Sequence, residues 1–371
     1  MGAGREGEGG KEREKPKSDA MSSGISPGAK KLLGVVAVIS GLSAVVIGMI
    51  VDRYGWVFLM DPLDKQNHFT QTEVDELVGN HTLLFVGGPH RGGTTILWKK
   101  LREHPEIAGF GDKVGADMSE GIFMQTVYPQ FGIGAEINAG RMQGRGTIKA
   151  NGDLDTRGLG RYMFNPDAHI TEDSNLVNAE NRMDLFNQWS YFWPVHDASK
   201  RVFLEKSPPN MMISRFLQAL FTVPGADVRF IFITRHPIAN AMAHHAWLAC
   251  RSQSIFELVL HWVVGHESLQ EDLPKLANAK FIRFEDFAAA PEETMAELHG
   301  WLGIGNPQLY GEVEVKPDTN DKYKAKYCAR LRADQRFRAA HERLVHKLGP
   351  RVKPFGYDLD EYDCGELELE Q

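Results

Sequence analysis

Four short apolar runs, each followed by a helical pattern, organise the chain beyond residue 80. The runs are almost continuous in Val, Ile, Leu and Phe, which is typical of strands that are buried on both faces of a sheet. The predicted strands are residues 83–87, 201–204, 229–234 and 280–284, and the predicted helices are residues 94–103, 210–221, a segment after Pro237, and 286–302. This alternation predicts an α/β fold, a single globular domain whose parallel sheet carries helices on both faces.

A different pattern precedes this domain. Residues 32–51 carry no charge and are apolar on every helical face, and about 20 such residues suffice to cross a hydrocarbon core of roughly 30 Å. The preceding tail is rich in Gly, Lys, Glu and Ser, which predicts disorder, and its Lys and Arg residues favour a cytoplasmic location. We expect a cytoplasmic tail (1–31), a transmembrane anchor (32–51), a stem (52–79) and a lumenal domain (80–371). A cleaved signal peptide is the alternative, which the length of the apolar run disfavours.

Composition narrows the possible partners. The 371 residues are 42% hydrophobic and carry a net charge of −7, which argues against general nucleic-acid binding but allows a local basic pocket. Three cysteines are too few for a disulfide scaffold, although one bridge, Cys328–Cys364, would tie down the C-terminus. The Cys and His spacing suggests no zinc site, so no metal is expected. The sequon Asn80-His81-Thr82 is consistent with a lumenal glycoprotein.

A glycine-rich loop joins the first predicted strand to the first predicted helix. Gly88 and Gly93 have the spacing of a phosphate-binding P-loop, in which backbone N–H groups and a helix N-terminus hold a phosphate group. A nucleotide kinase would place Lys at the next position, but Thr94 stands there, and the cation of this loop is Arg91. The loop therefore indicates a site for one phosphate-like group rather than for a metal-bound triphosphate.

Three segments resemble the membrane-anchored, Golgi-type sulfotransferase family. Residues 89–95 are similar to its Pro-x-Arg-Ser-Gly-Thr-Thr loop, residues 234–237 to its Arg-x-Pro element, and residues 284–292 to its Tyr-Glu-Asp-Leu…Pro-Glu segment. The chain departs from the family pattern at Gly92 and Ala243, where serine is usual. The resemblance is closest to the branch of tyrosylprotein sulfotransferases and related plant and bacterial enzymes.

This resemblance implies a site for the sulfate donor 3′-phosphoadenosine 5′-phosphosulfate. The loop residues that would hold its 5′-phosphosulfate are Arg91, Gly92, Gly93, Thr94 and Thr95. Arg235 would contact the 3′-phosphate, with Asn240 or His244 in place of the missing serine.

Sulfuryl transfer also needs a cation at the leaving oxygen and a base for the acceptor. Arg91 is the first candidate cation, and Lys206 is the second because it ends a strand at the edge where ligands bind in parallel sheets. Our choice of base is Glu120. The competing candidates are Asp112, Asp117, His244 and His245.

The resulting hypothesis is a sulfotransferase that moves a sulfuryl group to a hydroxyl of a carbohydrate or protein acceptor. It would be a single-pass type II protein of the Golgi membrane, and it would bind no nucleic acid. The alternatives are a P-loop nucleotide kinase or NTPase and a non-catalytic nucleotide-binding membrane protein. The residues do not name the acceptor.

Overall fold

The computed structural model describes residues 66–111, 119–130, 158–247, 250–305, 314–362 and 364. The expected tail and membrane anchor lie outside these residues, as does most of the expected stem. Within the part of the chain that is described, no helix combines the length and the apolar character needed to cross a membrane.

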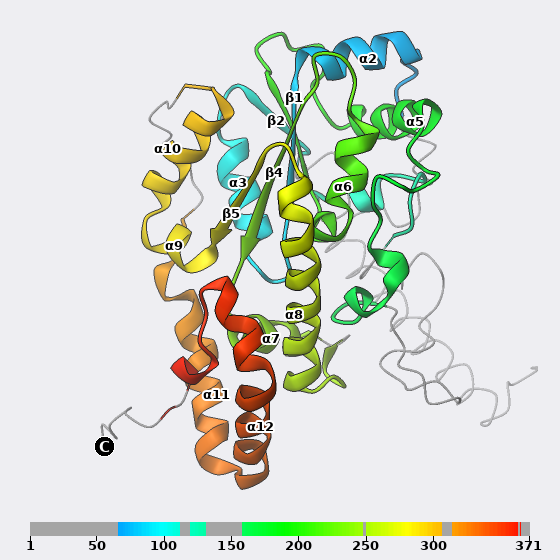
Figure 1. The fold of residues 1–371 in the computed structure, drawn as a ribbon. Coiled ribbons are helices and arrows are strands. Elements are labelled where there is room, and N and C mark those ends of the chain that lie inside the picture. The colour runs from blue at the N-terminus through cyan, green and yellow to red at the C-terminus, as the bar shows by residue number, and fades with distance from the viewer. Residues whose placement is uncertain are drawn as a thin grey trace, which may run out of the picture. The chain divides into compact units, whose positions relative to one another are not determined.

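A five-stranded parallel sheet forms the centre of the domain, with strand order β2-β3-β1-β4-β5 (Figure 1). Its strands are β1 (Thr82–Gly87), β2 (Ile107–Gly109), β3 (Val202–Lys206), β4 (Asp227–Thr234) and β5 (Ala279–Arg283). The four predicted strands are confirmed within a few residues. The three-residue strand β2 was not predicted, because so short a run gives no pattern.

Helices cover both faces of this sheet, as predicted. Their bounds are α2 (Gln71–Asn80), α3 (Thr94–Arg102), α5 (Ala179–Ser190), α6 (Asn210–Leu220), α7 (Pro237–His245), α8 (Ile255–Asp272), α9 (Phe284–Ala289), α10 (Pro291–Leu302), α11 (Asp321–Ala333) and α12 (Gln335–Val352). Leu83 and Phe85 of β1 pack with residues of α2, α5 and α6 on one face. Leu84 and Val86 pack with residues of α3, α9 and α10 on the other. Both faces of one strand are therefore buried, which explains its unbroken apolar run.

The helix predicted over residues 286–302 is in fact two helices. Ala290 has φ −139° and ψ 66°, so α9 ends there and α10 begins with Pro291 at its first turn. The break is a local effect, because proline disfavours the helical conformation of the residue before it and fits well at a helix start.

Part of the segment expected to be a stem has a defined structure. Helix α2 starts with a capping box between Thr70 and Glu73, and its Val74 and Val78 are fully buried in the core. The backbone of Phe69 exchanges two hydrogen bonds with the side chain of Asn187. The last part of the expected stem is therefore packed on the domain.

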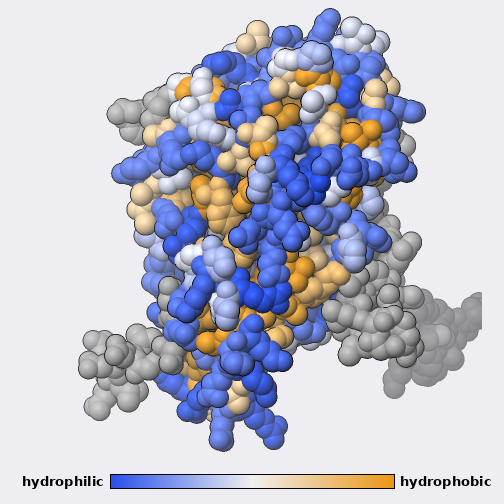
Figure 2. Space-filling model, viewed as in Figure 1, coloured by the Kyte–Doolittle hydropathy of each residue, from blue (hydrophilic) through white to orange (hydrophobic). Residues whose placement is uncertain are grey.

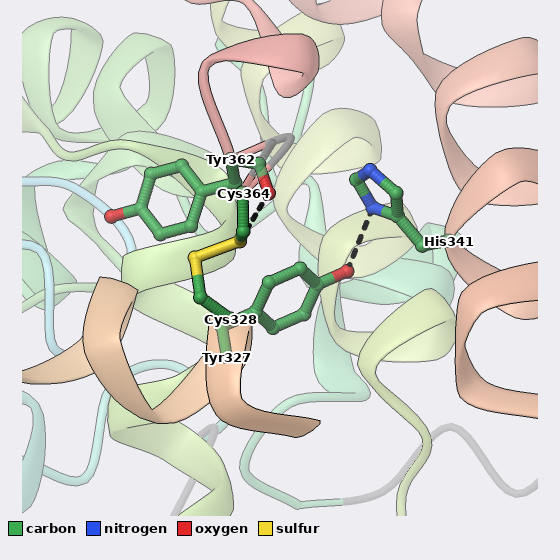
Figure 3. Close-up of a disulfide and its surroundings, with 5 residues drawn as sticks. All are labelled: Tyr327, Cys328, His341, Tyr362 and Cys364. Carbon is green, nitrogen blue, oxygen red and sulfur yellow. Dashed lines mark hydrogen bonds between the residues drawn. A yellow bond between two sulfur atoms is a disulfide. The ribbon is translucent and has the colours of Figure 1, made fainter. Parts of the chain in front are cut away.

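The disulfide suggested for the C-terminus is present. A disulfide joins Cys328 of α11 to Cys364, the last described residue (Figure 3). The side chains of Tyr327 and Tyr362 lie on either side of it. Beneath it, Tyr327 Oη and His341 Nδ1 of α12 are 3.0 Å apart. The remaining cysteine, Cys250, is buried, and its Sγ lies 3.7 Å from the carbonyl oxygen of Leu159.

Candidate active site

The glycine-rich loop presents the start of α3 at the C-terminal edge of β1. Gly88 and Gly93 have φ angles of 148° and 111°, which favour glycine. A Cβ on Gly88 would lie 2.1 Å from the carbonyl oxygen of Ile233 in β4. The loop therefore lies directly against the sheet edge, and the N-terminus of α3 is placed to bind an anion.

Arg91 occupies a strained position in this loop. Its φ of 62° is left-handed, a conformation that costs roughly 1–2 kcal/mol for a residue other than glycine. The side chain is exposed, and its guanidinium lies 5.1 Å from the centre of the Trp247 ring. Strain of this kind is concentrated at functional loops, and here it falls on the cation nominated from the sequence.

Arg235 and Asn240 hold the backbone of the same loop. Asn240 Nδ2 donates to the carbonyl oxygen of His90 at 2.8 Å, and Arg235 Nη1 donates to that of Arg91 at 3.2 Å. Arg235 Nε also donates to Asn320 Oδ1 at 2.7 Å. Both predicted donor-site residues therefore lie at the P-loop, and Arg235 links it to the segment that leads into α11.

Glu285 braces this arrangement from the end of β5. Its Oε1 accepts from the backbone N–H of His236 at 2.9 Å and from Asn320 Nδ2 at 2.6 Å, and its Oε2 accepts from Tyr357 Oη at 2.8 Å. One carboxylate thus joins four segments around Arg235. This gives a physical role to the acidic motif at residues 284–287.

Lys206 and Glu120 form a buried ion pair beside the loop. Lys206 Nζ lies 2.7 Å from Glu120 Oε1, and the side chains are 0% and 6% exposed. Burial raises the pKa of Glu120, while the charge of Lys206 acts in the opposite direction. The structure therefore brings together the cation and the base chosen from the sequence. The rival carboxylates Asp112 and Asp117 lie outside the described residues.

A buried carboxylate, which sequence reasoning missed, positions Glu120. Glu205 accepts from the backbone N–H of Gly121 at 2.8 Å, from Ser207 Oγ at 2.5 Å and from Asn210 Nδ2 at 2.6 Å. Burial raises the pKa of Glu205 to about 7, although these three donors favour the ionised form. The available signal was an acidic residue inside an apolar strand, since such a group needs partners.

The competing histidines have low proton affinity. Burial lowers the pKa of His244 to about 4, its Nδ1 lies 3.0 Å from the carbonyl oxygen of Asn240, and its Nε2 has no hydrogen-bond partner in the described structure. Burial also lowers the pKa of His245. His244 is therefore a neutral polar group, and both histidines lie in the last turn of α7.

The remaining predicted residues belong to the same loop and to the helix that follows it. Gly92 N–H closes a turn by donating to the carbonyl oxygen of Pro89 at 2.8 Å, and Thr94 and Thr95 form the first turn of α3. Among the described residues, no group of three or more His, Cys, Asp or Glu side chains could hold a metal ion.

The site and fold agree with the match to a family model. The model described as "Sulfotransferase family" matches residues 84–307, which is more than half of the chain and includes all the site residues discussed above except the start of α11 and the C-terminal segment. Comparison with curated proteins found no match.

Solved bacterial sulfotransferases show low similarity to the chain. The sulfotransferase domain of the Synechococcus PCC 7002 olefin synthase is 15% identical, with 66% of this chain and 88% of that chain covered and a TM-score of 0.40. For a sulfotransferase from Alicyclobacillus acidocaldarius, the identity is 17%, the coverage 67% and 94%, and the TM-score 0.37. For one from Mycobacterium tuberculosis H37Rv, the values are 16%, 67% and 72%, and 0.38.

The family assignment rests on the match to the family model. The chain belongs to the sulfotransferase family and is an enzyme that transfers a sulfur-containing group.

Proposed function

We propose that the enzyme transfers a sulfuryl group from 3′-phosphoadenosine 5′-phosphosulfate to a hydroxyl of a carbohydrate or protein acceptor. The observation that carries the proposal is the buried Lys206–Glu120 pair next to the P-loop. The end of β3 touches that loop directly, since Gly88 N–H donates to the carbonyl oxygen of Pro208 at 3.1 Å. A cation and a base therefore lie together beside a site for a phosphate-like group.

Each group then has a role in an in-line displacement. The N-terminus of α3 and Arg91 hold the 5′-phosphosulfate, and Arg235 binds the 3′-phosphate. The acceptor oxygen forms a bond to sulfur while the bond from sulfur to the bridging phosphate oxygen breaks. Lys206 stabilises the negative charge on that leaving oxygen, and Glu120 takes the acceptor proton. Adenosine 3′,5′-bisphosphate is the second product.

The Lys206–Glu120 contact explains how a buried carboxylate can act as this base. Burial raises the pKa of Glu120 and by itself favours the protonated form. The positive charge of Lys206 favours the ionised form, and the raised pKa increases its affinity for the acceptor proton.

We also propose that residues 32–51 anchor the enzyme in the Golgi membrane, with its domain in the lumen, as in the tyrosylprotein branch. Two features support a lumenal domain. The Cys328–Cys364 disulfide is typical of an oxidising compartment. Asn80 is exposed at the end of α2, where a glycan can be attached.

The donor can be tested by calorimetric titration with adenosine 3′,5′-bisphosphate. We expect binding that weakens by about tenfold to a hundredfold in Arg91→Ala and Arg235→Ala, because each variant loses a charged contact to a phosphate group. Arg201→Ala is the control, since Arg201 is an exposed cation at the opposite edge of the sheet. Tighter binding of ATP with magnesium would contradict the proposal.

The base can be tested by measuring how the rate of product formation depends on pH, with a tyrosine peptide or an oligosaccharide as acceptor. Glu120 acts in its ionised form, so kcat should rise with pH through its pKa, which burial places above the ordinary 4.5. Glu120→Gln should lower kcat by about a hundredfold or more. A rise in rate near pH 4 that survives in Glu120→Gln and is lost in His244→Asn would assign the base to His244 instead.

The positioning of Glu120 can be tested at Gly121. A Cβ there would lie 2.7 Å from Glu205 Oε1 and 2.8 Å from Trp189 Nε1, so Gly121→Ala should displace Glu120. We expect kcat to fall by about tenfold or more while bisphosphate binding is retained. Gly300→Ala in α10 is the matched control, because its Cβ would meet nothing within 4 Å. Equal kcat in the two variants would refute this role of the Glu205 network.

The anchor can be tested by expressing the full chain in animal cells. We expect it to stay with membranes during carbonate extraction, and its domain to resist protease until the vesicles are opened with detergent. An endoglycosidase should lower its mass, and Asn80→Gln should abolish that shift. Digestion of the domain in sealed vesicles would show the opposite orientation.

A further inference from the structure

Positive charge is concentrated in one element that the proposed chemistry does not use. Residues 321–353, which form α11, α12, the turn between them and the residue after α12, contain eleven Lys and Arg but only three Asp and Glu. This segment, here called the basic hairpin, has a formal charge of +8, whereas the whole chain has −7. The rest of the chain therefore carries −15, so anionic ligands are attracted mainly to the hairpin.

The cations of the basic hairpin face solvent. Its buried apolar residues, such as Leu331 and Leu344, pack with residues of α7 and α8. Eight of its cations are exposed and form no ion pair with any other described residue: Lys322, Lys326, Arg330, Arg332, Arg336, Arg338, Arg343 and Lys347. Surface cations are usually interspersed with acidic partners, so this unbalanced array indicates a binding surface.

The basic hairpin leads into the active site. Tyr323 of α11 lies 5.0 Å from the guanidinium of Arg235, measured to its ring centre. Leu331 of α11 packs in one apolar cluster with residues of α7. The charges of the neighbouring Arg330 and of Arg251 lower the pKa of His245 at the end of α7, after the larger effect of burial. The Trp247 ring that faces Arg91 follows two residues later. Cationic groups thus extend from the P-loop onto the hairpin.

The position of the hairpin leaves it open to a long ligand. Figure 1 shows α11 and α12 side by side, projecting beyond the sheet edge at which β4 ends. Their 13 and 18 residues correspond to helices of about 20 and 27 Å. Figure 2 shows mainly hydrophilic residues over this end of the domain.

The chemistry of the surface distinguishes between possible ligands. A helix that inserts into a membrane surface presents an apolar face. In the described part of the chain, the large hydrophobic residue that is exposed is Tyr191, which follows α5 and does not belong to the hairpin. A peptide that binds through backbone hydrogen bonds at a strand edge or in an apolar groove finds neither on two helices with exposed cations, and only an acidic peptide would pair with the clustered Arg. A polysaccharide with repeated anionic groups needs only spaced cations, and the Arg fork binds carboxylate and sulfate groups in bidentate fashion.

We propose that the basic hairpin binds an anionic polysaccharide with carboxylate or sulfate groups. The proposal that this polysaccharide is the sulfate acceptor rests on the function proposed above. The hairpin then holds the chain some distance from the reacting hydroxyl, and the cations near Arg330 direct it toward Arg91.

The test is binding of the full-length protein to heparin, with neutral dextran as a negative control. The variant Arg332→Gln/Arg336→Gln/Arg338→Gln removes three exposed charges near the tip of the hairpin. Its matched control, Lys200→Gln/Arg201→Gln/Lys275→Gln, removes three surface charges that precede β3 and β5 at the opposite sheet edge. We expect heparin affinity to fall by about tenfold in the first variant, with a weaker salt dependence, and to stay within about twofold in the second.

Three results would overturn the inference: equal heparin affinity in the two variants, tighter binding to phosphatidylserine vesicles than to heparin, or tighter binding to duplex DNA. The first result would show that the hairpin is not the heparin-binding surface. The second and third would show that the protein binds a membrane or a nucleic acid instead. Titration of the same variants with adenosine 3′,5′-bisphosphate separates this inference from the proposed function. Heparin binding that depends on the hairpin, in a protein that does not bind the bisphosphate, would uphold the surface and refute the donor.

Discussion

The site depends on two glutamates at the sheet edge, whose carboxylate oxygens must receive hydrogen bonds. A carboxylate removed from water needs donors on its oxygens. Glu205 obtains them from Gly121, Ser207 and Asn210, and Glu285 obtains them from His236, Asn320 and Tyr357. Each glutamate therefore draws distant segments to the carboxyl end of a strand, β3 for Glu205 and β5 for Glu285. The first holds the segment of Glu120, which pairs with Lys206, and the second holds the segments around Arg235.

In the proposed mechanism, these two networks support an acceptor side and a donor side of the site. Lys206 and Glu120 lie at the end of β3, where burial makes their mutual charge interaction strong. Arg91 and Arg235 lie at the P-loop, where backbone strain and buried hydrogen bonds fix their positions. Outside both lies the basic hairpin, whose cations are exposed and so act mainly through their summed field. Buried charges thus act by pairing directly with each other, whereas the exposed charges of the hairpin act together at longer range.

Local patterns in the sequence were enough to predict most of the fold. The strands were predictable because both of their faces are buried, which leaves an unbroken apolar run, and the P-loop was predictable because its glycines follow from backbone geometry. The break at Pro291 was also readable and was missed. The place of α2 was not readable, because Val74 and Val78 share a core cluster with residues of α5 and α6 that are more than a hundred positions away.

The sequence by itself therefore determined the α/β architecture, the phosphate loop, and the cations Arg91, Lys206 and Arg235, since each depends on residues adjacent in the chain. Only the tertiary structure decided that Glu120 meets Lys206 across 86 positions, and that Glu205 holds it there. Hydrogen bonds between distant segments leave no periodic trace in a single sequence. The same holds for the basic hairpin, whose composition is plain but whose approach to the active site depends on how α11 packs beside α7.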